Sequence, residues 1–281
     1  MDHLPIEKSR RIIMFYDLRD STDILLNFEQ GVYCGAVATN GESFTYENFI
    51  LDFHRTSYEE LYLGHNNTYS EIYGDGLMAI FPEDNVKYIL ENIYRLTKRM
   101  RNYNDAMGVG VLKPSIDIGF GITMGESSLI YYHLDRRHHP VGISVHEAAR
   151  IEGVSKFYDA RVLISKSFFK AAEGYISSDP RFDYRFIDRV RLKSFRKPIT
   201  LYELLIDNDP RFENKISSIP FYLDGYAKFC NREWAVAKKI FLKIQHDFGL
   251  GIGSVMARRC DILALSPPKE DWKGIWKMKD K

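Results

Sequence analysis

The apolar run RIIMFYD (residues 11–17) constrains the fold more than any other feature of the sequence, because it ends abruptly at a carboxylate. Its length and its β-branched content predict a buried strand. The next segment, Ser21–Glu29, spaces its apolar residues at helical intervals, and either Ser21 or Thr22 can cap its start. The first expected pair of elements is therefore a buried strand that delivers Asp17 to the start of a helix.

A second carboxylate is expected at the tip of a hairpin. Tyr69–Tyr73 and residues 77–81 are short apolar runs separated by Gly74-Asp75-Gly76. An aspartate flanked by glycines between two such runs is a strong hairpin signal, because glycine tolerates the backbone angles of tight turns. We therefore predict two strands joined by a turn that holds Asp75.

The rest of the first two thirds of the chain alternates helices and strands. Helical spacing predicts further helices over residues 46–63, 84–103, 144–157 and 166–172. Strand patterns cover residues 115–123, 161–164, 184–187, 190–192 and 199–205. This order predicts an α+β domain over residues 1–207, with one mixed, mainly antiparallel sheet and helices packed against it.

The last part of the chain has a different character. Residues 207–210 and 217–220 are rich in turn-forming types, and helices are predicted over residues 221–230, 233–248 and 253–264. Two of these helices resemble a tetratricopeptide-type hairpin, which cannot bury its apolar face alone. We therefore predict a helical tail over residues 208–281 that packs on the first domain or on a partner.

Composition and charge exclude several classes of protein. The 39 Lys and Arg residues against 38 Asp and Glu leave a net charge of +1, which offers no general attraction to a nucleic acid or an anionic membrane. No apolar run reaches the roughly 18–20 residues that span a bilayer. The 3 cysteines match neither a zinc site nor a disulfide framework, which favours a reducing cytoplasm.

The two aspartates at strand ends form the best candidate for a chemical site. Carboxylates that converge from adjacent strands can clamp two divalent ions about 3.5–4 Å apart. The free backbone N–H groups at the start of the helix near Ser21 offer a cradle for phosphate. Taken singly, Asp17 and Asp75 are more typical of a helix cap or a turn residue, and it is their pairing that favours a metal site.

Four motifs follow one another between residues 11 and 205. They are the strand and loop FYDLRDST, the hairpin IYGDGLMAIF, the helix GISVHEAARIEG and the closing segment VRLKSFRKPITLYEL. Together they resemble the class III nucleotidyl cyclases, the adenylate/guanylate cyclase catalytic domain family. The helices that end in DWKGIW resemble the tail that often follows this domain in bacterial cyclases.

The resemblance implies a cyclisation reaction. The 3′-hydroxyl of a ribonucleoside triphosphate attacks its own α-phosphate and expels pyrophosphate. Asp17, Leu18 and Asp75 match the ligands of two divalent cations, Mn²⁺ or Mg²⁺, of which one activates the nucleophile and the other steadies the triphosphate. Arg150 matches the arginine that stabilises transition-state charge on the α-phosphate.

The resemblance also assigns residues to the phosphates and the ribose. Lys193 matches a triphosphate-binding lysine, and Ser21 and Thr22 match the phosphate loop. His146 stands where the family has an asparagine, and its imidazole can still donate a hydrogen bond, although a structural histidine is as typical of this position. Asp20 stands where the family has a glycine in this loop. Its carboxylate either caps the helix or repels the triphosphate, unless a metal ion or Arg19 compensates its negative charge.

Subunit pairing follows from the same resemblance. In this family two catalytic domains pair head to tail, with the metals bound by one subunit and the arginine and the lysine supplied by the other. This chain carries both sets of residues. The resemblance therefore implies a homodimer with two composite sites for a nucleoside triphosphate.

The base pocket departs from the pattern of the adenylate cyclases. They carry a lysine and an acid at the positions of Glu71 and His139. Glu71 only accepts hydrogen bonds, while His139 can donate, and this pair suits the N3–H and O4 of uracil or the N1–H and O6 of guanine. Guanylate cyclases carry a glutamate at the position of Glu71, but the bulky run Arg136–His139 favours a smaller pyrimidine.

A bacterial subgroup of short cyclases without sensor domains makes cyclic UMP or cyclic CMP as an antiphage signal, and this chain resembles it in layout. We therefore expect UTP as the substrate, ahead of CTP. The alternatives are a guanylate or adenylate cyclase, and a degenerate domain that only binds nucleotide, which would not need Asp17, Asp75, Arg150 and Lys193 together. A diguanylate cyclase would need a GG[DE]EF-type hairpin, which YGDGL does not supply.

Overall fold

The computed structural model describes residues 6–33, 44–62, 69–106, 113–133 and 136–278. Cys34 lies outside these residues, and the other two cysteines are free. The strands are β1 (Ile6–Leu18), β2 (Tyr69–Tyr73), β3 (Gly76–Pro82), β4 (Ile118–Tyr132), β5 (Arg137–Val141), β6 (Val162–Ser165), β7 (Phe182–Arg191), β8 (Ile199–Ile206) and β9 (Trp276–Lys277). The helices are α1 (Ser21–Glu29), α2 (Tyr46–Tyr62), α3 (Val86–Asp105), α4 (Ile143–Gly153), α5 (Lys166–Ser178), α6 (Phe212–Cys230), α7 (Trp234–Phe248) and α8 (Ile252–Leu265).

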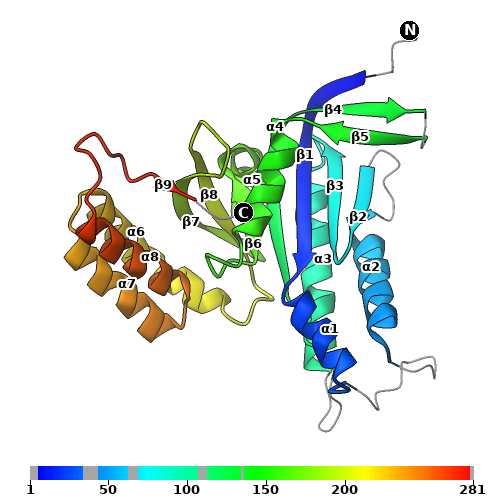
Figure 1. Ribbon diagram of the computed structural model, residues 1–281, viewed down its shortest axis with the longest axis horizontal. Coiled ribbons are helices and arrows are strands. Elements are labelled where there is room, and N and C mark those ends of the chain that lie inside the picture. Colours follow the sequence, from blue (N-terminus) through cyan, green and yellow to red (C-terminus); the bar gives the residue numbers. More distant parts are fainter. Residues whose placement is uncertain (1–5, 34–43, 63–68, 107–112, 134–135, 279–281) are drawn as a thin grey trace.

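All of these strands belong to one mixed sheet, in the order β2-β3-β1-β4-β6-β8-β7-β9, with β5 paired to β4. The β4–β6 and β7–β9 pairs are parallel, and the other pairs are antiparallel. Figure 1 shows β2 at one end of the sheet and the C-terminal helices at the other. The predicted fold class, a mainly antiparallel α+β sheet with helices packed on it, is confirmed.

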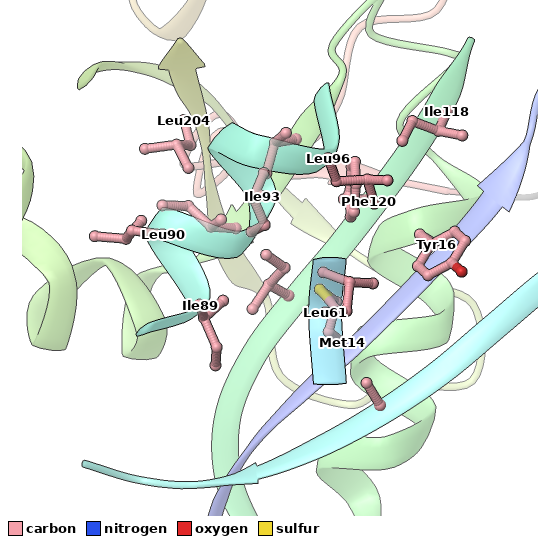
Figure 2. Close-up of a cluster of buried hydrophobic side chains, with 14 of the residues drawn as sticks. Met14, Tyr16, Leu61, Ile89, Leu90, Ile93, Leu96, Ile118, Phe120 and Leu204 are labelled. Atoms are coloured by element: carbon pink, nitrogen blue, oxygen red, sulfur yellow. The ribbon is translucent and has the colours of Figure 1, made fainter. Parts of the chain in front are cut away.

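The main core lies on one face of the sheet. Met14 and Tyr16 of β1 point into it, because every second residue of a strand faces the same side. Figure 2 shows them opposite Ile93 and Leu96 of α3, whose long apolar stripe covers this face. This core fixes β1 rigidly, and with it the strand end that carries Asp17.

The opposite face is covered by α4. Ile13 of β1 packs there against Val145 and Ala148 of α4, in a cluster that also holds Met78 of β3. Figure 1 shows α4 crossing in front of the sheet over β1 and β4. Asp17 lies four residues after Ile13 on the same strand. Its side chain therefore faces the same side of the sheet as Ile13, which is the side that α4 covers.

The C-terminal helices pack on the first domain, which decides between the two arrangements that the sequence left open. Tyr222 of α6, Phe241 of α7 and Met256 of α8 share one buried cluster with Ile187 of β7. The chain then returns to the sheet, where Trp276 pairs with β7 as part of β9 (Figure 1). The tail is thus built into the edge of the sheet.

Several elements differ from the sequence prediction. Residues 217–220 are not a linker, because α6 begins at Phe212 and continues through Pro220. The helix is held on both sides of the proline, by the ion pair of Lys215 with Glu203 and by the hydrogen bond from Tyr222 to the Ile187 carbonyl. These contacts offset the backbone bond that proline removes.

The two short strands predicted over residues 184–192 are one strand, β7, with a bulge between Phe186 and Asp188. β5 was not predicted, because its sequence RHHPV lacks the apolar alternation of a half-buried strand. Its position as an edge strand explains why Pro140 is tolerated. Within the described residues, no helix has both the length and the apolar character needed to cross a membrane.

Candidate active site

The structure brings the two predicted metal-binding carboxylates to the same edge of the sheet. Asp17 is the register partner of Gly76, which directly follows Asp75. A Cβ atom built on Gly76 would lie 2.8 Å from Oδ1 of Asp17, so the carboxylate of Asp17 occupies the space above this glycine. Only glycine at position 76 leaves room for Asp17 beside the turn that holds Asp75.

The turn itself is fixed from the side of α2. His54 is buried, and its Nε2 lies 2.8 Å from the backbone oxygen of Gly74. Tyr46, at the start of α2, lies near enough to Asp75 that the carboxylate adds to the effect of burial in raising the pKa of the phenol. The hairpin prediction over Tyr69–Tyr73 is confirmed in its bounds, and α2 supplies the support that the sequence did not reveal.

These groups fit hard divalent cations. The carboxylates of Asp17 and Asp75 offer oxygen ligands, and the side chain of Leu18 is buried in the core, so that Leu18 can contribute only its backbone carbonyl. No cluster of three or more His, Cys, Asp or Glu side chains with metal-binding geometry occurs among the described residues. A cation held by two carboxylates keeps further positions for water and phosphate oxygens, which is usual for Mg²⁺.

The start of α1 differs from the prediction. Asp20, and not Ser21 or Thr22, occupies the N-cap position, and its side chain makes no cap hydrogen bond. Its φ of 58° is in the left-handed region, which explains why a glycine suits this position. The Asp20 carboxylate pairs with Lys156. Lys156, and not Arg19, therefore supplies the charge that compensates Asp20.

Arg19 faces away from Asp20. Its guanidinium donates to Asp117, to the Ser155 hydroxyl at 3.3 Å and to the Ala160 carbonyl at 2.5 Å. Sequence reasoning did not find this role, because no local pattern links residue 19 to residues 155 and 160. The phosphate loop is thus tied to the segment that follows α4.

α4 carries the two residues predicted to act on the α-phosphate. Its buried residues include Val145 and Ala148, which face the sheet, while His146 is exposed and Arg150 is half-buried. Arg150 has no hydrogen-bond or ion-pair partner within the described part of the chain. The spacing of His146 and Arg150, four residues apart, places both side chains on one face of the helix.

Lys193 is not brought to Asp17 within one chain. It lies exposed in the turn after β7, and the strands β4, β6 and β8 separate β7 from β1. Four strand spacings of about 4.8 Å place the two residues about 19 Å apart or more. Lys193 has no ion-pair partner among the residues that the structure describes.

Glu71 is held by its neighbours on β2. The hydroxyl of Tyr69 donates to Oε2 of Glu71 at 2.7 Å, and the hydroxyl of Tyr73 donates to the same oxygen. Burial, followed by the bond to Glu71, raises the pKa of both phenols, which keeps them protonated donors. The spacing of two along a strand, which puts Tyr69, Glu71 and Tyr73 on one face, was the signal in the sequence for this arrangement.

His139 lies on β5, which pairs with the outer part of β4. It pairs in register with Ile130, and its ring lies 4.9 Å from that of Tyr132 in an edge-to-face arrangement. The β4–β5 hairpin curls over the end of β2 and β3 (Figure 1), and the neighbouring Arg137 lies near enough to act on the pKa of Tyr69. The β4–β5 hairpin therefore lies near Tyr69 of β2, while β3, β1 and β4 separate β2 from β5 in the order of the sheet.

Comparisons with known proteins point to one family, although no protein-family model matches the chain. An adenylate cyclase of Dictyostelium discoideum, specific to terminal differentiation, is 29% identical over 167 residues, or 57% of this chain and 8% of that protein. An adenylate cyclase of Anabaena cylindrica is 29% identical over 143 residues, or 47% of this chain and 26% of that protein. The match therefore spans a small part of both relatives.

Solved structures share the fold. The adenylyl cyclase CyaB of P. aeruginosa has a TM-score of 0.55 at 17% identity and covers 72% of this chain and 96% of its own. A bacterial light-regulated adenylyl cyclase has a TM-score of 0.54 at 12% identity. The matched region covers 72% of this chain and 53% of that protein's chain. The chain therefore has the fold of these cyclase catalytic domains, and part of its sequence is similar to two adenylate cyclases.

Proposed function

We propose that the chain is a nucleotidyl cyclase, which converts a ribonucleoside triphosphate into a 3′,5′-cyclic nucleotide and pyrophosphate. The observation that carries this proposal is the register of Asp17 with Gly76, which sets the Asp75 turn beside the end of β1. Two carboxylates at one sheet edge, next to a helix start with its backbone N–H groups, suit a triphosphate and its cations.

Each residue has a role in this reaction. Divalent cations at the site supply Lewis-acid chemistry to the 3′-hydroxyl and to the phosphates. Asp17 and Asp75 would hold them through carboxylate oxygens, and Leu18 through its backbone carbonyl. The backbone N–H groups of Ser21 and Thr22 bind phosphate oxygens.

Arg150 stabilises the charge that develops on the α-phosphate, and Lys193 binds the triphosphate. His146, on the same face of α4 as Arg150, orients the ribose or the α-phosphate by donating a hydrogen bond. Arg150 and Lys193 carry their charge without an ionic partner among the described residues, which leaves both free for a ligand.

We infer that the working site is composite and forms in a homodimer. The separation of Asp17 and Lys193 across the sheet supports this, because a single chain would leave the triphosphate without its lysine. In a twofold dimer the metal-binding edge of one subunit meets α4 and the β7–β8 turn of its partner. Each dimer then has two sites.

We propose a pyrimidine base, UTP ahead of CTP, from the chemistry of Glu71 and His139. Both tyrosine hydroxyls donate to Oε2 of Glu71, which leaves Oε1 of the carboxylate as an acceptor for the base. An acceptor suits the N3–H of uracil and repels the ring N1 of adenine, while His139 can donate to O4. By resemblance to the pyrimidine cyclases of bacteria, we also propose a role in antiphage signalling.

A guanylate cyclase is the second candidate, because the N1–H of guanine also suits Glu71. The test is to incubate the purified protein with each of ATP, GTP, CTP and UTP and Mn²⁺, and to identify the products by mass spectrometry. Cyclic UMP as the main product supports the proposal, and cyclic GMP overturns the base assignment. Absence of every cyclic nucleotide favours a domain that only binds nucleotide.

A further inference from the structure

The segment after α4 contacts both the helical tail and the phosphate loop. We call residues 154–161, between α4 and β6, the junction loop. It follows directly from the helix that carries Arg150, so its position fixes the C-terminal end of that helix. The contacts of the junction loop come from two regions that are otherwise apart in the chain, the tail and the residues just before α1.

On the tail side, Asp159 is the main contact. Nη1 of Arg211 lies 2.7 Å from both carboxylate oxygens of Asp159, and the Gly251 N–H donates to Oδ2 at 2.9 Å. Asp159 has a φ of 51°, in the left-handed region, which aspartate adopts more readily than most non-glycine residues. A Cβ atom on Gly251 would lie 3.1 Å from Asp159, so the tail approaches the loop closely.

A second contact on the tail side is fully buried. The Tyr158 hydroxyl donates to Oδ2 of Asp188 at 2.7 Å and accepts from Nη2 of Arg259 at 2.8 Å. Arg259 also pairs directly with Asp188. α8 therefore holds the junction loop against the bulge of β7 through a charge pair that is closed to solvent.

On the site side, the junction loop holds the phosphate loop. Arg19 donates to the Ser155 hydroxyl and to the Ala160 carbonyl, and Lys156 pairs with Asp20. Arg19, two residues after Asp17, is thus bonded to the junction loop, the same eight-residue segment that the tail contacts. The loop is short, and its two sides cannot move independently.

We propose that the tail positions the active-site groups through the junction loop, with Asp159 and Arg211 as positioning residues. This inference rests on the proposed cyclase function. Within a composite dimer, Arg150 serves the metal site of the partner, while Arg19 and Asp20 lie between Asp17 and Ser21 of the chain's own site. One junction loop therefore reaches both sites of the dimer, and the tail controls the geometry of each.

The test compares Asp159→Asn with Asp261→Asn in the full-length chain. Asparagine tolerates the left-handed backbone but loses the charge that Arg211 binds. Asp261 is a matched control, because it pairs with Lys238 between α7 and α8 and has no contact with the junction loop. Arg211→Gln breaks the same pair as Asp159→Asn from the other side.

We expect Asp159→Asn and Arg211→Gln to lower kcat about tenfold with KM within about twofold, because misplaced groups lose transition-state contacts more than substrate affinity. Hydrogen exchange measured by mass spectrometry should rise in residues 19–24 and in α4 as well as in the junction loop. Asp261→Asn should change neither kcat nor exchange in these segments.

Exchange that rises only in the tail and the junction loop, with kcat as in Asp261→Asn, overturns the inference. If the wild-type chain makes no cyclic nucleotide, the proposed function fails, but the exchange measurement still decides the inference. Increased exchange at residues 19–24 then supports the mechanical coupling, and unchanged exchange there overturns it.

Discussion

The proposed metal-binding edge, with Asp17 and Asp75, and the tail junction, where the C-terminal helices pack on β7 and β8, use charged residues in opposite ways. At the junction, Arg259 and Lys215 are buried, and each is paired with carboxylates, Asp188 for Arg259 and Glu203 with Asp209 for Lys215. In the proposed site, Arg150 and Lys193 have no carboxylate partner among the described residues. A buried pair leaves a fold strongly destabilised when one partner is removed, while a charge without a partner is available to a ligand.

The largest expected effect is a loss of catalysis from a substitution at the proposed metal-binding edge. Asp75→Asn removes a charged cation ligand and should lower kcat/KM on the order of 10⁴-fold, or about 5 kcal/mol. Because Asp75 lies in a turn and is outside the core, the free energy of unfolding should change by less than about 0.5 kcal/mol. Steady-state kinetics and denaturant titration together check this. A large loss of stability would show that the residue has a structural role.

At the tail junction, a substitution should lower the stability of the fold more than it lowers catalysis. Asp188→Asn leaves the guanidinium of Arg259 buried without its counter-charge, which should reduce the free energy of unfolding by about 3–4 kcal/mol. Asp261→Asn, at an exposed pair, should change it by less than about 0.5 kcal/mol. Urea unfolding of the two variants makes the comparison. Equal stability of both would contradict a structural role for the buried pair.

Acid should weaken the fold through Asp209 at the tail junction. Burial opposes ionisation of Asp209, but Lys215 and Arg161 outweigh it and hold its pKa at about 2, below the ordinary 3.8. The unfolded state thus binds more protons between these values, and stability falls as the pH falls. The loss from this group should reach about 1 kcal/mol by pH 3 and about 2 kcal/mol by pH 2.

The measurement is the free energy of unfolding of the wild type and of Asp209→Asn between pH 6 and pH 2. The two curves should converge toward low pH, because the variant has no carboxyl to protonate at this position. Parallel curves would show that Asp209 is not held in its charged form by Lys215.

The smallest expected effect concerns the base. Glu71→Gln keeps the shape of the side chain but adds a donor, and the preference for UTP over ATP in kcat/KM should fall about tenfold. Tyr73→Phe removes one of the two hydroxyls on Oε2 and should cause a smaller shift in the same direction. An unchanged preference in both variants would show that Glu71 does not contact the base.

Local sequence patterns predicted the helices and strands whose apolar residues recur at a regular spacing. β2 and α1 were predicted in their full bounds, because period-two and helical spacing are explicit in them. β5 and β9 were missed, since the pairing of a polar edge strand depends on its neighbour and not on its own pattern. The continuous helix through Pro220 was missed because its support comes from contacts with β7 and β8.

The same limit applies to the site. Asp17 and Asp75 were predictable because each stands at the end of a clear strand or turn. The roles of Arg19 and Lys156 were not, because they bind residues more than a hundred positions away, and long-range pairing leaves no local trace. Lys193 was predicted from resemblance alone, and its position in the sheet gives the separation from Asp17 that the proposed dimer explains.

Mixing two inactive variants tests the central claim of a composite site most directly. Asp75→Ala lacks the metal ligand and Arg150→Ala lacks the guanidinium, so each homodimer is inactive, whereas a hybrid dimer keeps one complete site. After denaturation and refolding of an equal mixture, we predict about a quarter of wild-type cyclase activity, since half of the dimers are hybrids with one working site of two. Activity that stays at the level of the separate variants would contradict the account.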